Sequence, residues 1–192
     1  KSVLLEETPW VLDAQNEAQQ KKNIALLFNM AKMSKELTRS LEKLKQMQSY
    51  NGGFVWFKGG PDDRYMTQYI ITGIGHLMNL NAVSQNISDQ LKTILNKGIP
   101  YLDNRIREDY EELLRYKINL KLNNTGYTQI QYLYMRSFFT DVPVLDNCKT
   151  AFEYYKQQTQ QFWLENGKYS QGMIALELYR FGDTKTPLKI LA

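Results

Sequence analysis

Hydrophobic and polar residues follow the period of an amphipathic helix over most of this chain. Apolar positions three or four residues apart predict one helix over about 13–32 and a second that begins at a cap on Ser34. A third helix is predicted over about 64–79 and a fourth over about 88–117. We expect Pro100 to kink or break the fourth, because proline lacks a backbone N–H.

Helical patterns continue through the C-terminal part of the chain. The segment LNNTGYT is a predicted turn, with Thr125 or Thr128 as the cap of the next helix. The segment TDVPVLDN interrupts the pattern, two more helices follow, and another begins near the C-terminus. Only Val3–Leu5 reads as an extended run, so we predict an all-α fold of about seven or eight helices.

The order of these helices suggests their packing. Twice, a polar amphipathic helix ends in an Asn-Gly turn and leads into a more apolar helix with small residues, near Asn51 and near Asn166. This alternation fits outer helices leading to inner helices of an α/α toroid. A simple helical solenoid would give a similar pattern, and periodicity does not separate the two.

Length and charge narrow the class of protein. The 192 residues suit a single helical domain over 1–192. The net charge of +4 is spread along the chain, which does not suggest nucleic acid or a membrane surface as a partner. No apolar run approaches the roughly 18 to 20 residues that span a bilayer. Because the chain opens with Lys1 and no signal peptide, we expect a piece of a longer protein.

Few residues suggest catalysis. Cys148 is the only cysteine and His76 the only histidine, so a disulfide, a thiolate-rich site and a two-histidine metal site are not expected. We interpret both as structural, and we expect no metal and no cofactor. The mixed charges of 105–115 predict ion pairs four residues apart, namely Arg105–Asp109, Arg107–Glu111 and Glu111–Arg115, on a solvated helix face.

The acidic pair Asp62 and Asp63 has two possible roles. Paired carboxylates could perform acid/base work in an α/α-toroid enzyme, such as a glycosidase, a lyase or a prenyl-type transferase. They also stand directly before a predicted helix, where acidic residues satisfy free backbone N–H groups. We favour the capping role.

The stretch SYNGGFVWFKGGPDDRY and the helix after it carry a family resemblance. They resemble the thioester-domain region of bacterial α2-macroglobulin-like proteins, most specifically from Gln48 to Leu77. The matching positions are Gln48, Asn51, Gly52, Gly53, Phe54, Trp56, Phe57, Gly59, Gly60, Tyr65, Thr67 and Tyr69. Segments Glu7–Gln20 and Glu177–Asp183 are also similar to the family, and the middle of the chain is less so. The same corner resembles turns of terpenoid cyclases and protein prenyltransferases.

The resemblance implies a partial α/α toroid within a large envelope protein of tandem β-sandwich modules that traps or inhibits proteases. Active members carry a Cys-x-Glu-Gln thioester motif, whereas Cys148 is followed by Lys149, Thr150 and Ala151. Either the motif precedes Lys1 or this is a thioester-lacking member. We favour the second alternative, a non-enzymatic domain without catalytic residues in this chain. Its implied partners are proteases and neighbouring modules of the same chain. Its implied location is the bacterial periplasm or cell surface, in some members as a lipoprotein. A purely structural helical spacer is the other non-enzymatic alternative.

The glycine-rich stretch is expected to be a structural corner. Gly52 and Gly53 would let the chain reverse, using backbone angles closed to other residues. We expect Phe54, Trp56 and Phe57 to seal the end of a helix pair. If Trp56 is buried, Trp56→Ala should cost about 3 to 5 kcal/mol; a loss below about 1 kcal/mol would instead indicate an exposed aromatic loop and a binding site.

Overall fold

The computed structural model describes residues 17–80 and 83–192 and divides the chain into two compact units, Lys1–Gln46 and Met47–Ala192. The predicted extended run Val3–Leu5, the start of the first predicted helix and most of the family segment Glu7–Gln20 lie outside the described residues. The assignment of 1–192 to one domain stays a prediction.

A single long helix, α3 (Glu17–Met47), replaces the two helices predicted for this part of the chain. The predicted cap at Ser34 is wrong: Ser34 lies inside the helix, and its carbonyl oxygen accepts a hydrogen bond from the Thr38 hydroxyl at 3.0 Å. Residues 17–47 contain neither glycine nor proline, so nothing in the sequence interrupts the helix there.

The unit Met47–Ala192 is mostly helical, which confirms the all-α class. Its α-helices are α4 (Arg64–Asn79), α5 (Gln85–Arg115), α6 (Tyr127–Arg136), α7 (Lys149–Phe162), α8 (Lys168–Arg180) and α9 (Thr186–Leu191). Two short 3-10 turns, η1 (Asp146–Cys148) and η2 (Trp163–Glu165), flank α7. The described residues form one small antiparallel sheet, in which β1 (Phe54–Val55) pairs with β2 (Asp62–Asp63).

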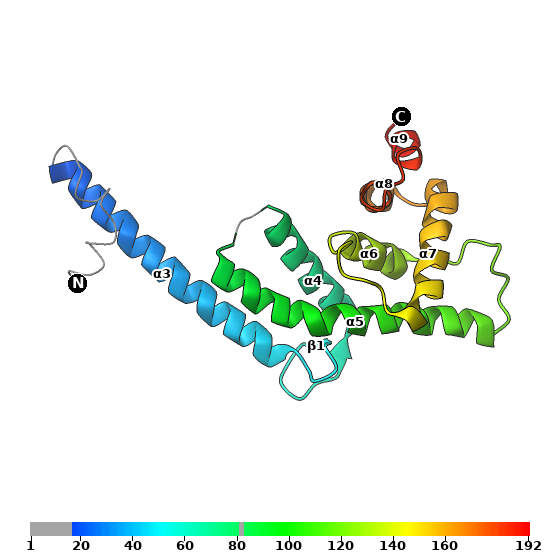
Figure 1. Cartoon of the computed structure of the whole chain (residues 1–192), viewed down its shortest axis with the longest axis horizontal. Helices are drawn as coiled ribbons and strands as arrows, with labels where there is room; N and C mark the ends of the chain where they lie inside the picture. Colours follow the sequence, from blue (N-terminus) through cyan, green and yellow to red (C-terminus); the bar gives the residue numbers. More distant parts are fainter. Residues whose placement is uncertain (1–16, 81–82) are drawn as a thin grey trace. The chain divides into compact units, whose positions relative to one another are not determined.

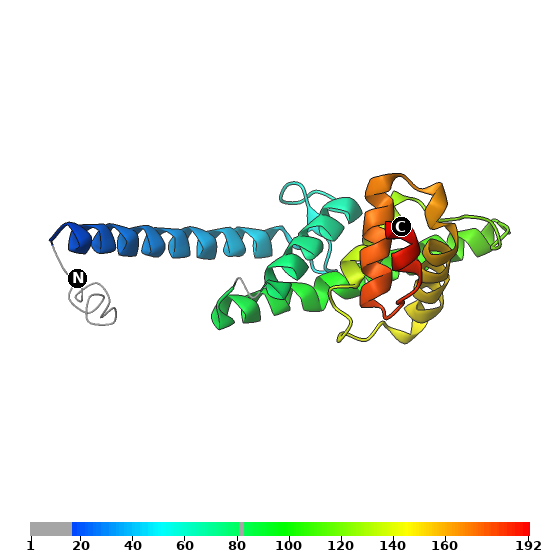
Figure 2. The same cartoon turned by 90° about the horizontal axis from the view of Figure 1, so that it is seen from above.

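These helices pack in two rows. Helices α4, α6 and α8 contact one another in sequence order, and α9 packs on α8. Helices α5 and α7 contact each other and lie against this row (Figure 1). Helix α8 runs across the direction of α5, as both views show (Figure 2). Successive helices from α4 to α8 therefore alternate between the two rows.

Three predicted boundaries are wrong. Helix α5 begins after Ser84 instead of at Ser88, and it continues through Pro100 without a break. Buried neighbours on both sides of the proline, Ile99 and Leu102, hold the helix together. Helix α6 is capped by Gly126, whose backbone N–H donates to the side chain of Gln129, and not by Thr125 or Thr128.

Two glycines allow close contact between helices. A Cβ on Gly98 of α5 would lie 2.6 Å from Ile71 Cδ1 of α4, and a Cβ on Gly75 of α4 would lie 2.8 Å from Phe138 Cβ. Gly73, two positions before Gly75 in α4, has no such neighbour. No atom lies within 4 Å of a Cβ built on Gly73, which faces open space.

A buried ion pair links α5 to α6. Arg136 Nε lies 3.0 Å from Asp103 Oδ1, and the Tyr132 hydroxyl donates to the same oxygen at 2.7 Å. Arg136 also donates to the carbonyl oxygens of Phe139 at 2.8 Å and Val142 at 2.9 Å. Burial raises the pKa of Asp103, although Arg136 and the tyrosine hydroxyl oppose this shift. This pair therefore fixes both α6 and the chain that leaves it.

Helix α8 carries a second buried acid, Glu177. Its side chain is fully buried, and neither carboxyl oxygen has a hydrogen-bond partner among the described residues. The nearby Thr159 hydroxyl of α7 donates to the carbonyl oxygen of Lys156. Burial raises the pKa of Glu177 well above its ordinary value. Burial therefore favours the neutral, protonated form of this carboxyl group.

Candidate interaction site

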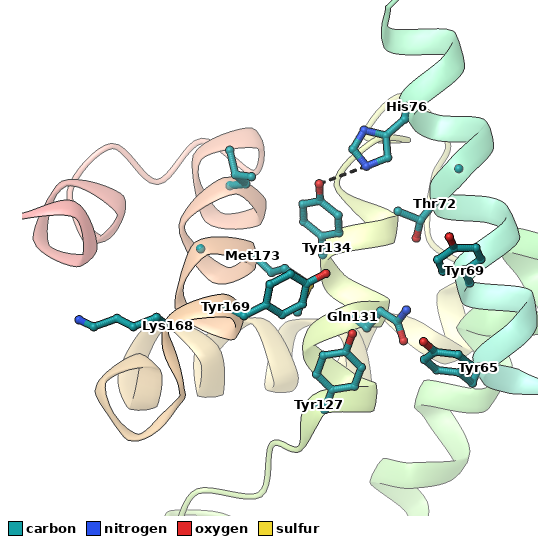
Figure 3. Close-up of a pocket in the computed structure, with 13 residues that line it drawn as sticks. Tyr65, Tyr69, Thr72, His76, Tyr127, Gln131, Tyr134, Lys168, Tyr169 and Met173 are labelled. Carbon is teal, nitrogen blue, oxygen red and sulfur yellow. Dashed lines mark hydrogen bonds between the residues drawn. The ribbon is translucent and has the colours of Figure 1, made fainter.

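Helices α4, α6 and α8 line an open groove of about 680 Å³, which we call the tyrosine groove (Figure 3). Its lining residues are Tyr65, Tyr69, Thr72, Gly73, His76, Tyr127, Gln131, Tyr134, Lys168, Tyr169, Gly172, Met173 and Leu176. On each helix they recur three or four positions apart, the spacing that puts side chains on one helix face. Each helix thus presents one aromatic or polar stripe to the groove.

Tyr65, Tyr69, Tyr127 and Tyr169 of the groove are exposed, whereas Tyr134 is half-buried. Tyr65 and Tyr69 have the four-residue spacing of apolar helix positions, but both side chains are more than half exposed. The buried face of α4 instead carries Ile71 and Ile74. This helix therefore has an aliphatic stripe facing the core and a separate tyrosine stripe facing the groove.

Three of the rings converge. Burial and the neighbouring hydroxyl groups of Tyr169 and Tyr65 raise the pKa of Tyr127 above its ordinary value. Tyr65 belongs to α4, Tyr127 to α6 and Tyr169 to α8. Figure 3 shows the three rings around the side-chain amide of Gln131. Residues far apart in the sequence thus form one aromatic surface.

A chain of hydrogen bonds orients Gln131 at the floor of the groove. Arg64 Nε donates to Gln68 Oε1 at 3.1 Å. This bond fixes the orientation of the Gln68 amide, so that its Nε2 is free to donate to other groups. Gln68 Nε2 donates to the Thr128 carbonyl oxygen at 3.2 Å and to Gln131 Oε1 at 3.1 Å. Arg64 is itself fixed by a bidentate pair with Asp109, at 2.7 and 2.8 Å. Gln131 therefore turns its Nε2 donor toward the groove.

His76 lies at one end of the groove. Its Nε2 is 3.3 Å from the Tyr134 hydroxyl, and its ring centroid is 4.6 Å from that of Phe138. The Arg180 guanidinium stacks on the same cluster, 3.9 Å from the Phe138 centroid. These contacts agree with a hydrogen-bonded histidine held by aromatic neighbours.

The glycine corner reverses the chain as expected. Gly52 has φ of +101°, in the left-handed region that favours glycine, and Gln48 Nε2 donates to its carbonyl oxygen at 3.0 Å. A Cβ on Gly53 would lie 2.9 Å from Asp62 Cβ. Asn51 completes the corner by donating to Asp62 and accepting from the Gly53 N–H.

Substitution of Gly52 by alanine is expected to destabilise the protein more than the same change at Gly59. Both glycines have positive φ, but a Cβ on Gly52 would lie 2.1 Å from the Lys97 carbonyl oxygen, whereas Gly59 has open space around it. Backbone strain of about 1 to 3 kcal/mol applies to both, and the clash adds to it at Gly52. Urea unfolding of the two variants measures the difference; equal losses would contradict this packing.

The aromatic residues of the corner divide into one buried and two exposed. Phe54 is fully buried, and its N–H donates to the Thr67 hydroxyl at 2.8 Å. Trp56 and Phe57 are each 65% exposed, so the expectation that all three seal a helix end is wrong for these two. The strand pairing of β1 ends at Val55, after which the chain turns outward. Trp56 Nε1 donates to Asp63 at 3.0 Å on the surface.

We therefore expect Phe54→Ala and Trp56→Ala to differ sharply. Loss of the buried Phe54 ring should lower the free energy of unfolding by about 3 to 5 kcal/mol. Loss of the exposed Trp56 ring should cost about 1 kcal/mol or less, the scale of one surface hydrogen bond. Chemical denaturation of both variants checks this, and a large loss at Trp56 would restore the sealing role.

The candidate acids and the cysteine do not reach the groove. Asp63 caps α4 by accepting from the Met66 N–H at 2.6 Å, which confirms the capping role. Neither Asp62 nor Asp63 lines the groove. Cys148 is buried in the turn before α7, as expected for a small structural residue, and burial raises the pKa of its thiol.

The charged run of α5 forms only part of the predicted ion pairing. Arg107 and Glu111 pair at 2.6 Å, as predicted. Arg105 pairs with Glu108 instead of Asp109, because Asp109 is taken by Arg64 of α4. The predicted Arg105–Asp109 pair is therefore wrong: the acid serves packing between helices.

Within residues 17–80 and 83–192, no group of three or more His, Cys, Asp or Glu side chains is placed to hold a metal ion. No helix in the part of the chain that the structure describes has the length and apolar character needed to cross a membrane. No protein-family model, curated protein or solved structure matches this chain.

Proposed function

We propose that this chain is a non-enzymatic helical domain of a bacterial α2-macroglobulin-like protease inhibitor, acting through contacts between proteins and without a thioester of its own. The observation that carries the proposal is the exposed aromatic surface of the tyrosine groove. Tyrosine combines a large apolar ring with a polar hydroxyl, and it is enriched where proteins bind one another.

The packing of the helices supports the partial α/α toroid. Helices α4, α6 and α8 would be the inner helices, and α5 and α7 the outer ones. Hydrogen bonds join the family-motif residues Gln48 to Gly52 and Phe54 to Thr67 at the corner where the chain turns into α4. This position agrees with the role that the resemblance assigns to them.

The chemistry of the candidate residues favours a binding role. The thioester of active family members is formed by the Cys and Gln of a Cys-x-Glu-Gln motif, whereas Cys148 is followed by Lys149, Thr150 and Ala151. A toroid enzyme using Asp62 and Asp63 needs these carboxylates in a cavity, whereas Asp63 caps a helix and Asp62 pairs with Asn51. A helical spacer would leave the exposed tyrosines without a role.

The partners that follow from this proposal are proteases and neighbouring modules of the same polypeptide, in the periplasm or at the cell surface of a bacterium. The test uses the whole protein that contains this chain, mixed in turn with proteases of different classes. A trapped protease should still cleave a small peptide substrate while losing activity on a large protein substrate. The same proteases without the protein are the control, and unchanged cleavage of both substrates across the panel would overturn the proposal.

A further inference from the structure

We infer that the tyrosine groove binds an extended, uncharged peptide segment of a partner protein. A backbone carbonyl oxygen of the segment would accept a hydrogen bond from Gln131 Nε2, and an aromatic or aliphatic side chain would pack among the tyrosine rings. The inference rests on the proposed function in one respect, that the partner is a protein.

The polar part of the argument is an unused donor. Gln131 is only 6% exposed, and its Oε1 already accepts from Gln68. Its Nε2 has no hydrogen-bond partner among the described residues, and Figure 3 shows the amide turned into the groove. Because this donor opens onto the groove, a group bound there can supply its acceptor. A peptide carbonyl oxygen is such an acceptor.

The orientation of this donor is built into the fold. A chain of hydrogen bonds runs from Asp109 of α5 through Arg64 and Gln68 of α4 to Gln131 of α6. The bond from Arg64 fixes the orientation of the Gln68 amide, and the bond from Gln68 fixes that of the Gln131 amide. Gln131 therefore cannot turn its carbonyl oxygen to the groove without losing the bond to Gln68. A preformed donor of this kind lowers the entropic cost of binding.

The apolar part of the argument is the wall of the groove. Tyr65, Tyr69, Tyr127 and Tyr169 expose their rings above Met173 and Gln131. A volume of about 680 Å³ lies within the usual range of about 300 to 1,000 Å³ for ligand pockets. Rigid rings of this kind provide large contact areas and lose little side-chain entropy when they bind.

The scarcity of charged groups in the groove indicates that the bound segment is uncharged. No acidic side chain lines it, and the ammonium group of Lys168 points away from the rings (Figure 3). A charged side chain placed among the rings would lose water without gaining a partner, which is costly. A sugar chain is also disfavoured, because its many hydroxyl groups need several donors and acceptors and the floor offers mainly one amide. An uncharged peptide segment fits best.

Helix α8 offers a matched pair of variants for the test. Tyr169 lines the groove and is 73% exposed, whereas Tyr179 lies outside it and is 66% exposed. The probe is a library of random 12-residue peptides displayed on phage, selected on the 192-residue chain. The affinities of selected synthetic peptides are then measured by fluorescence polarisation. We expect at least a tenfold weaker affinity for Tyr169→Ala and less than a twofold change for Tyr179→Ala.

A second variant tests the amide. Gln131→Glu keeps an oxygen that accepts from Gln68 but removes the donor, and we expect at least a tenfold weaker affinity, with the fold retained by circular dichroism. Equal affinities for the wild type and both groove variants, or no enriched peptide, would overturn the inference. The inference would also be overturned if the groove bound an oligosaccharide or a second copy of this chain and Tyr169→Ala abolished that binding, because the groove would then have a different occupant. If the whole protein traps proteases but the selected peptides bind Tyr169→Ala as tightly as the wild type, this inference fails while the proposed function stands.

Discussion

Arg136→Met is expected to lower the free energy of unfolding by about 3 to 5 kcal/mol. Arg136 and Asp103 are almost completely buried, and removal of the guanidinium leaves the carboxylate without a compensating charge. The change also removes the donors to the carbonyl oxygens of Phe139 and Val142. Urea unfolding followed by circular dichroism measures the loss.

The double variant Asp103→Asn with Arg136→Met is the control. It removes both charges but keeps an oxygen at position 103 that accepts from the Tyr132 hydroxyl. We expect this variant to be more stable than Arg136→Met alone, because no unpaired charge remains buried. A single variant that loses less than about 1 kcal/mol would show that the pair does not hold α5 and α6 together.

Replacement of Glu177 by glutamine is expected to change how stability depends on pH. The folded-state pKa of Glu177 is raised well above its ordinary value because the side chain is fully buried. The folded protein therefore keeps this proton where the unfolded chain, with an ordinary glutamate pKa of about 4.3, releases it. Stability from this group is complete below about pH 4 and falls as the pH rises, by up to about 1.4 kcal/mol per pH unit.

A glutamine side chain cannot lose a proton, so the Glu177→Gln variant lacks this fall. We expect the free energy of unfolding of the variant, relative to that of the wild type, to grow as the pH rises above the ordinary glutamate pKa. The comparison cancels the contributions of other titrating groups that both proteins share. Denaturant titrations at four pH values between 5 and 8 measure it, and a constant difference between the two proteins would contradict a buried, protonated Glu177.

The sequence predicted the glycine corner because its signal is local. Gly52 has a positive φ, which the turn formed by its sequence neighbours requires. A Cβ on Gly52 would also meet the backbone of Lys97, and that contact depends on the tertiary fold. The same local pattern was wrong for Trp56 and Phe57. Their burial depends on which segment covers the loop, and no spacing within the loop encodes that.

The tyrosine groove was missed for a related reason. Tyr65 and Tyr69 have the spacing of a buried face, and periodicity alone does not separate them from Ile71 and Ile74 on the true core face. The sequence of α4 does contain a signal that separates the two faces. Its tyrosine and histidine positions form one stripe along the helix, and its buried isoleucine positions form another. The role of Gln131 could not be predicted, because it depends on a hydrogen bond from Gln68, 63 positions away.

The helix boundaries at Ser34 and Pro100 were predicted wrongly for two different reasons. Ser34 is a good cap in isolation, but helix-forming residues on both sides continue the helix past it. Pro100 removes one hydrogen bond, and the buried side chains of α5 around it offset that loss.

Photo-crosslinking in the whole protein tests the central claim most directly, namely that this chain holds a partner polypeptide in the tyrosine groove. A photoreactive benzoyl-phenylalanine is placed at position 169 or, as the control, at position 179 of the same helix, and the protein is irradiated with a protease that it traps. We predict a cross-link from position 169 to a defined polypeptide segment, which a selected groove-binding peptide competes away, and none from position 179. Equal cross-linking from both positions, or none from position 169 while the protease is trapped, would contradict the account.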